Sequence, residues 1–362
     1  MGLTCYVRAD IAEGLMAEVT IHREGVAGRI TLNRPQALHA LNEEMCLAMD
    51  AALKLWADDP DVELVVVDHA AGSRGFCAGG DIRMLAESGT ADGSAAQAFF
   101  RAEYRLNTRI KNYSKPYVAF MDGVTMGGGV GISVHGSHRV ATERTLFAMP
   151  ETGIGLFPDV GGGWFLPRLG PPLGMWLALT GERLKGGDVV AAGVATHFAE
   201  SSVLEALKAQ VCDGALELLE AMDWDEAGSF EKYDDVMARC FSGGSVEDIV
   251  AALEGEASDT PAGQWAKNQL DTLKTKSPRT LKVAHRQLTE GLKMQSFEDN
   301  MRMEFRIGCR QVHSRDFQEG VRAVIVDKDN APKWDPATLA GVTHRMLDEV
   351  FAPLGDDELT FD

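Results

Sequence analysis

Residues 114–131 read SKPYVAFMDGVTMGGGVG, and this stretch decides the expected fold. Its apolar run, residues 117–120, is bounded by turn signals, which is typical of a strand buried on both faces. The glycines at 127–129 stand where a helix is expected to begin, and a helix start exposes unpaired N–H groups. Because glycine has no side chain, a ligand can approach that backbone closely. The turn therefore either holds a phosphate or oxyanion or only packs tightly.

The same strand-to-helix unit recurs along the first half of the chain. Residues 64–67, LVVV, predict another short buried strand, followed by the loop GSRGFCAGGD (72–81) and a helix from about Ile82. A repeated order of strand, strand and helix predicts an α/β layered core. Further expected elements are a hairpin at 17–32, a helix at 42–57 with Asn42 as its N-cap, a helix at 95–113, and strands at 139–141 and 146–148.

Helices dominate after about residue 200. Residues 215–231 and 235–256 are acidic and predict a helical surface elaboration, whereas residues 278–320 predict two or three amphipathic helices. No low-complexity linker separates these segments from the first half. We therefore expect a core of residues 1–205 and a mainly helical region of residues 206–362 packed on it.

The composition limits the partners and the compartment. The formal charge of −19 makes nucleic acid and anionic membranes poor partners. The cysteines, at positions 5, 46, 77, 212, 240 and 309, form no CxxC pair, which favours reduced thiols. No apolar run is long enough to cross a bilayer, and the first ten residues lack the features of a secretory signal or transit peptide. We expect a cytoplasmic protein, or a mitochondrial matrix protein whose transit peptide has been removed.

Common phosphate-binding and hydrolase motifs are missing from the sequence. There is no GxxxxGK[ST], the glycines at 127–131 lack the spacing of GxGxxG, and no GxSxG surrounds a serine nucleophile. His135 and His138 form an HxxH pair without the further ligands of a zinc site, so we expect no metal there. His39 lies in a predicted loop and is expected to make a polar contact.

Residues 149–163, MPETGIGLFPDVGGG, place Glu151 and Asp159 among apolar residues, glycines and prolines. Charged side chains are unfavourable in such surroundings unless they are paired or used in chemistry. Pro150 and Pro158 directly precede the two acids and restrict the backbone there. We interpret the acids as catalytic carboxyls with raised pKa values; the alternative is a salt-bridged or helix-capping pair.

Four stretches, in this order, resemble the crotonase (enoyl-CoA hydratase/isomerase) superfamily: LNRPQALHALN (32–42), FCAGGDI (76–82), MDGVTMGGGVG (121–131) and FAMPETGIGLFPDVGGG (147–163). The resemblance is strong over about residues 17–200. It implies an α/β fold, a crotonase-like spiral of ββα units closed by a C-terminal helical region. It also implies that the chain binds an acyl-CoA thioester, with the backbone N–H groups of Gly80 and Gly128 as the oxyanion hole.

The resemblance also gives the acids a use. Hydratases of the superfamily handle water with two glutamates, of which one aligns with Glu151, whereas the other position is Gly131 in this chain. Asp159 stands where hydratases have glycine. This exchange resembles a hydrolase branch, and so do SPRTLKVAHRQL (277–288) and DFQEGVRAVIVDKDNAPKW (316–334). The resemblance therefore implies hydrolysis of the thioester of 3-hydroxyisobutyryl-CoA, an intermediate of valine breakdown.

The roles implied for single residues are as follows. Glu151 acts as nucleophile, through a transient mixed anhydride, or as the base that activates water. Asp159 orients the water or the substrate hydroxyl and shuttles a proton towards the departing thiolate. Glu103 contacts the acyl group, and its alternative is a solvated helix acid. Backbone near the coenzyme is expected at Ala37, Ala78 and Asp81, with Arg34, Arg83 and Lys328 as candidates for its phosphates.

Two alternatives to the hydrolase remain. One is an enoyl-CoA hydratase or isomerase of the same fold, which would need another acid in place of Gly131. The other is a non-catalytic CoA-binding protein, which has no need of Glu151 and Asp159. The resemblance implies no cofactor beyond the CoA of the substrate and no metal. Family members assemble in various ways, so a homo-oligomer is one expectation.

Overall fold

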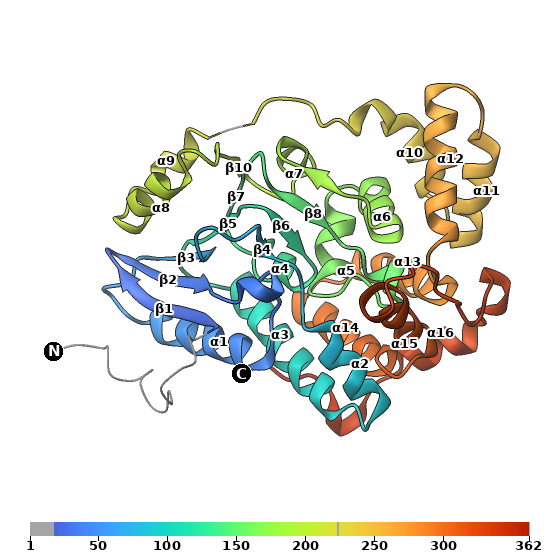
Figure 1. The fold of residues 1–362 in the computed structure, drawn as a ribbon, viewed down its shortest axis with the longest axis horizontal. Helices are drawn as coiled ribbons and strands as arrows, with labels where there is room; N and C mark the ends of the chain where they lie inside the picture. The colour runs from blue at the N-terminus through green and yellow to red at the C-terminus, as the bar shows by residue number, and fades with distance from the viewer. Residues whose placement is uncertain (1–17, 223, 362) are drawn as a thin grey trace.

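The computed structural model describes residues 18–222 and 224–361 (Figure 1). Predictions that concern the first ten residues, including Cys5, lie outside the described residues. Two β-sheets form the core of the fold: β4, β6 and β8 lie near the centre of the molecule, whereas β1 and β2 lie at its left edge next to α1 (Figure 1). Among residues 18–222 and 224–361, no helix is both long enough and apolar enough to cross a membrane.

The larger sheet has six strands in the order β1-β2-β3-β5-β7-β10. β1 and β2 are antiparallel, and each later neighbour in this order is parallel. One face of the sheet is covered by apolar residues of α8 (Leu204–Cys212) and by Leu219 of α9 (Glu217–Glu220). The six strands are β1 (Val19–Glu24), β2 (Ala27–Leu32), β3 (Leu64–His69), β5 (Tyr117–Met121), β7 (His138–Ala141) and β10 (His197–Phe198).

The smaller sheet has four strands in the order β4-β6-β8-β9. The chain alternates between the two sheets, since β3 continues into β4, β5 into β6 and β7 into β8. Helices follow the first two of these pairs, so the predicted spiral of strand-strand-helix units is confirmed. The strands of the smaller sheet are β4 (Gly75–Cys77), β6 (Val124–Met126), β8 (Leu146–Ala148) and β9 (Leu184–Lys185).

Two predicted loops contain strands, and the prediction is wrong there. The loop expected at 72–81 includes β4, and the glycine-rich turn expected between the strand 117–120 and the next helix includes β6. Each of these strands has three residues, which is too short for a recognisable alternation of apolar and polar side chains. Gly75 allows close pairing, because a Cβ added there would lie 2.8 Å from the Cβ of Val124 on β6.

The helices expected in the first half are confirmed. In α1 (Glu43–Ala57) the Asn42 side chain accepts a hydrogen bond from the N–H of Met45 at 2.9 Å, as expected of an N-cap. The long helix α3 (Ser94–Lys111) packs against α1. The other helices of this half are α2 (Ile82–Thr90), α3 (Ser94–Lys111), α4 (Gly128–Gly131), α5 (Gly162–Phe165), α6 (Pro171–Thr180) and α7 (Gly187–Ala191).

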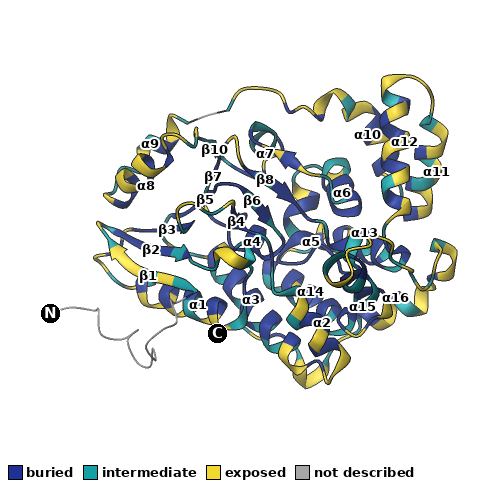
Figure 2. Cartoon of the chain, viewed as in Figure 1, coloured by how far each residue is buried: buried dark blue, intermediate teal, exposed yellow. Residues whose placement is uncertain are grey.

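Residues 278–320 form three amphipathic helices, as predicted. These are α13 (Pro278–Gly291), α14 (Phe297–Gln311) and α15 (Arg315–Val321). They pack on the first half of the chain: α13 contacts α5, α14 contacts α3, and α15 contacts α2. Figure 2 shows their buried surfaces turned towards the rest of the molecule.

The acidic segments are less helical than expected. The described residues of 215–231, which are all but residue 223, include α9 and the start of a 3₁₀ turn (Glu231–Tyr233), and residues 235–256 divide into two helices around Gly243 and Gly244. Glycine is unfavourable inside a helix, which explains the break. The remaining helices are α10 (Asp234–Phe241), α11 (Val246–Glu256), α12 (Pro261–Lys274) and α16 (His344–Phe351).

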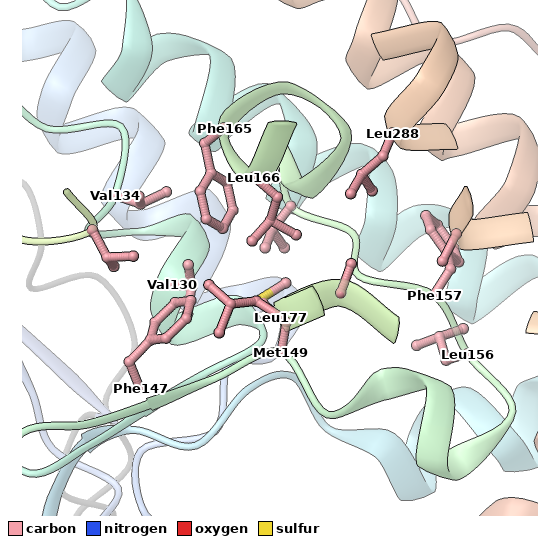
Figure 3. Packing of buried hydrophobic residues seen from close by; sticks show 14 of the residues in the cluster. Val130, Val134, Phe147, Met149, Leu156, Phe157, Phe165, Leu166, Leu177 and Leu288 are labelled. Atoms are coloured by element: carbon pink, nitrogen blue, oxygen red, sulfur yellow. The ribbon is translucent and has the colours of Figure 1, made fainter. Parts of the chain in front are cut away.

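Apolar side chains enclose the segment 149–163 (Figure 3). Its own residues Met149, Leu156 and Phe157 are buried. Around them lie Val130 of α4, Phe147 of β8, Leu166, Leu177 of α6 and Leu288 of α13. The two acids of this segment therefore lie in the apolar surroundings that the sequence indicates.

Candidate active site

A small cavity lies where the glycine-rich turns and the segment 149–163 meet. Its volume is about 80 Å³, which suits a short acyl group. α3, the end of β4, the start of α4 and the turn before α5 all contribute to its wall. The lining residues are Ala78, Gly79, Gly80, Ile82, Leu85, Phe99, Phe100, Glu103, Met126, Gly127, Gly128, Pro150, Glu151, Ile154, Leu156 and Asp159.

Two backbone N–H groups in this cavity are free to bind an oxygen. Leu41 holds the loop around Gly80, since its N–H donates to the Gly79 carbonyl at 2.8 Å and its carbonyl accepts the N–H of Asp81 at 2.9 Å. α4 begins at Gly128, as predicted. The N–H groups of Gly80 and Gly128 donate to no other described residue. The two loops touch, because a Cβ added at Gly79 would lie 4.0 Å from the Gly128 nitrogen.

Three carboxyl groups surround these glycines. Glu103, Glu151 and Asp159 are 2%, 5% and 6% exposed, so the alternative of a solvated Glu103 is wrong. Glu103 Oε1 and Glu151 Oε2 are buried and have no hydrogen-bond partner among the described residues. A Cβ added at Gly128 would lie 2.5 Å from Glu103 Oε1 and 3.2 Å from the carbonyl carbon of Gly79, so glycine allows both groups to approach closely. None of the three acids forms an ion pair with another described residue, which contradicts the salt-bridge alternative.

Burial changes the acidity of all three groups. It raises the pKa values of Glu103 and Glu151 well above the usual range of a glutamate, and the negative charge of Asp159 adds to both shifts. Burial also raises the pKa of Asp159, to about 6, against the opposing effect of the Tyr104 hydroxyl. Several carboxyls in one enclosed space with raised pKa values are a frequent feature of sites that carry out acid–base chemistry.

Tyr104 is a site residue that the sequence analysis missed. Its hydroxyl donates a hydrogen bond of 2.8 Å to Asp159 Oδ2. Its ring is fully buried between Phe100 and Phe305, so the hydroxyl has little freedom to turn away. The sequence offers one weak signal, the position of Tyr104 next to Glu103 on the same helix, and nothing that pairs it with Asp159.

The position of the second hydratase glutamate is closed. A Cβ added at Gly131 would lie 2.6 Å from the Cβ of Val160 and 2.9 Å from Asn107 Nδ2. Val160 and Asn107 are both buried, so neither can move easily into solvent. The structure therefore has no room at residue 131 for any side chain, and least of all for a glutamate.

Gly131→Ala is expected to destabilise the fold by ~1–3 kcal/mol, because overpacking in a dense interior forces neighbouring atoms apart. Urea unfolding measures this effect. Gly255→Ala is the matched control, since an added Cβ there meets no atom within 4 Å. Gly255 lies in α11, so its replacement is expected to be neutral or stabilising. Equal stability of the Gly131 variant and the parent would contradict the closed packing.

Only some of the residues predicted to contact the coenzyme line the cavity. Ala78 lines it, whereas Ala37, in the 3₁₀ turn Pro35–Ala37, and Asp81 do not. The Asp81 side chain caps α2 and pairs with Arg34 at 3.1 Å. Arg34 also pairs with Glu18. The other two basic candidates, Arg83 and Lys328, are exposed.

The histidines make structural contacts. His39 accepts a hydrogen bond from the N–H of Arg34 at 2.9 Å and shares another with the Ser73 hydroxyl, so the predicted polar contact is confirmed. His135 donates from Nε2 to the Val160 carbonyl at 2.7 Å. Burial lowers the pKa of His135 to about 3, which keeps the ring neutral.

A family model described as enoyl-CoA hydratase/isomerase matches residues 27–351. The chain belongs to this family. Its ββα units agree with the spiral that the resemblance implied from four short stretches of sequence. The superfamily assignment made from the sequence is thereby confirmed.

Curated relatives with 45–48% identity to this chain carry the same name. A protein of Danio rerio named "3-hydroxyisobutyryl-CoA hydrolase, mitochondrial" is 48% identical over 356 residues, which cover 95% of this chain and 91% of the relative. The relative of the same name from Homo sapiens is 45% identical over 357 residues, with the same coverage of both chains. The hydrolase branch that the sequence resembles is therefore represented among the relatives.

Two solved structures with 40% identity to this chain carry other names. A carnitinyl-CoA dehydratase from Mycobacterium thermoresistibile has a TM-score of 0.89 and 40% identity, and covers 95% of this chain and 99% of its own. An enoyl-CoA hydratase from Rhodobacter sphaeroides has a TM-score of 0.88 and 40% identity, and the match covers 95% of this chain and 100% of the hydratase chain. The fold is therefore common to both sets of names, and the choice between hydrolysis and hydration depends on the site.

Proposed function

We propose that this chain hydrolyses the thioester of 3-hydroxyisobutyryl-CoA to 3-hydroxyisobutyrate and CoA. The closed space at Gly131 is the observation that carries the proposal, because it removes the second glutamate of a hydratase. Asp159 supplies a carboxyl from another element in the same cavity. The names of the curated relatives support the same choice.

In the proposed reaction the thioester oxygen accepts hydrogen bonds from the N–H groups of Gly80 and Gly128. These two donors stabilise the negative charge that develops on the oxygen. Glu151 then attacks the carbonyl carbon, or removes a proton from a water that attacks it. The carbon–sulfur bond breaks, and CoA leaves as a thiolate that takes up a proton from the Asp159 carboxyl, which regains one from the water that is consumed. In the first route water hydrolyses the resulting anhydride and regenerates Glu151.

Asp159 and Glu103 are proposed to bind the 3-hydroxyl group and the reacting water. Their carboxyls lie in the same cavity as the two glycines, and Tyr104 fixes one oxygen of Asp159. A site with polar groups placed for a hydroxyl rejects an analogue that lacks it, since those groups are left without partners. Recognition of the 3-hydroxyl would therefore separate this substrate from plain short acyl-CoA esters.

The purified protein is expected to release CoA rapidly from 3-hydroxyisobutyryl-CoA, as measured with a thiol reagent. Isobutyryl-CoA, which lacks the hydroxyl, is the matched substrate and is expected to react at least ~10²-fold more slowly. A chelator is expected to leave the rate unchanged, because the proposed reaction uses no metal ion. No thiol release, together with loss of the conjugated absorbance of crotonyl-CoA, would favour the hydratase alternative.

Compartment and assembly are separate proposals. The vertebrate relatives are named as mitochondrial proteins, which supports a mitochondrial matrix location over a cytoplasmic one. Fractionation of the source cells tests this location. A homo-oligomer remains a prediction, and light scattering on the eluted protein tests it.

A further inference from the structure

The turn that carries Asp159 has a strained backbone. Val160, the next residue, has a φ of 51°, in the left-handed region that β-branched residues rarely adopt. Such a conformation persists only where the surrounding structure holds it in place. The direction of the Asp159 side chain therefore depends on contacts that fix the turn on both sides of Val160.

Glu304 of α14 holds the far side of this turn. Its Oε2 accepts a hydrogen bond from the N–H of Gly161 at 2.7 Å, and its Oε1 accepts one from the N–H of Gly163 at 2.9 Å. Gln287 donates to Glu304 Oε1 at 3.0 Å and also to the Pro158 carbonyl at 2.8 Å, on the near side of Asp159. Together these bonds bracket the strained residue.

The surroundings of Glu304 are unusual for an acid. The side chain is fully buried, and its hydrogen-bond donors are neutral N–H groups, including the amide of Asn300 at 2.9 Å. No described lysine, arginine or histidine forms an ion pair with it. Burial raises the pKa of Glu304 to about 7, and the bonds from Gly161 and Gly163 oppose this shift. A buried acid without an ion-pair partner lowers the stability of the fold, so its presence points to a role other than stability.

α14 also supports the other contact of Asp159. Phe305, the residue after Glu304, packs edge-on against the Tyr104 ring, with the ring centres 6.4 Å apart. Tyr104 in turn donates to Asp159. Two neighbouring residues of one C-terminal helix therefore contact both the turn that follows Asp159 and the tyrosine that donates to Asp159.

We propose that Glu304 is a positioning residue for thioester hydrolysis: through the N–H groups of Gly161 and Gly163 it holds the strained turn that aims Asp159 into the cavity. This inference rests on the proposed function. Glu304 itself does not line the cavity, so it acts through Asp159 and not on the substrate.

Glu304→Gln tests this role, because it keeps the shape but presents an NH₂ group to one of the two backbone donors. We expect kcat to fall ~10–10²-fold with KM little changed, as for a small misplacement of a catalytic group. Glu298→Gln is the matched control on the same helix, since Glu298 bonds Asn112 and Ser296 away from the cavity. Its kcat is expected to equal that of the parent.

A double-mutant cycle separates positioning from general stability. In an Asp159→Asn background, Glu304→Gln is expected to cause no further loss of kcat, because its effect passes through Asp159. An unchanged kcat in the folded single variant, or fully additive losses, would overturn the inference. If the amide variant does not fold, Glu304→Asp keeps the charge and is expected to fold with a reduced kcat; a parental kcat there would overturn it equally. Absence of thiol release by the parent would instead refute the proposed function.

Discussion

Replacing Glu151 by glutamine is expected to lower kcat for thioester hydrolysis by ~10²–10⁴-fold with little change in KM. The amide fills the same space but can neither attack a carbonyl carbon nor accept a proton from water. Glu151 is buried in the cavity, and its Oε2 has no partner among the described residues, so a substrate or water is free to meet it. Thiol release at several substrate concentrations measures both constants.

The loss of kcat identifies a chemical role of Glu151 only if the Glu151→Gln variant still binds acyl-CoA. Titration calorimetry with a non-hydrolysable thioether analogue is expected to show the same affinity for the parent and for Glu151→Gln. Glu254→Gln makes the same chemical change at an exposed position of α11 and is expected to leave kcat unchanged. A Glu151→Gln protein that binds the analogue and keeps its turnover would exclude Glu151 as nucleophile and as base.

The pH dependence of kcat/KM is expected to follow the ionisation of Glu151. Burial and the charge of Asp159 raise the pKa of Glu151, so acidification protonates it at a higher pH than an ordinary glutamate. Both proposed roles of Glu151 need the ionised form. The kcat/KM of the parent is therefore expected to rise with pH across the acidic range.

The repeated units could be predicted from the sequence because they depend on local patterns. An apolar run between turns, a helical period and an N-cap such as Asn42 are each encoded within a few residues. Glu151, Asp159 and the glycine turns were also readable, since acids and glycines in an apolar segment are locally out of place. The same local reasoning misplaced β4 and β6, whose three residues show no period.

The contacts that complete the site could not be predicted, because they join distant parts of the chain. Tyr104 and Asp159 are 55 residues apart, and Glu304 and Gly161 are 143 residues apart. Periodicity places Tyr104 and Glu304 on helices but does not say which segment each helix meets. The acidity of the site has the same origin, since the raised pKa values depend on burial by remote elements.

Asp159→Asn is expected to separate activity from stability. The kcat is expected to fall by ~10²–10⁴-fold, because an amide cannot take up or pass on a proton. The fold is expected to persist, since Tyr104 can donate to the amide oxygen as it does to the carboxylate. Circular dichroism and thiol release on the same preparation measure the two properties.

The stability of the Asp159→Asn variant should exceed that of the parent at neutral pH. Burial raises the pKa of Asp159 from 3.8 to about 6, so the folded state holds its proton more tightly than the unfolded state. The parent therefore loses stability as the pH rises from about 4 through about 6, by up to about 3 kcal/mol at 1.36 kcal/mol per pKa unit. The asparagine variant has no such proton to lose, so urea unfolding should show a difference that grows with pH. Asp259→Asn, at an exposed position, is the control and should show no such trend. If the parent were more stable than Asp159→Asn at pH 7, the Asp159 carboxylate would be better solvated than its burial indicates.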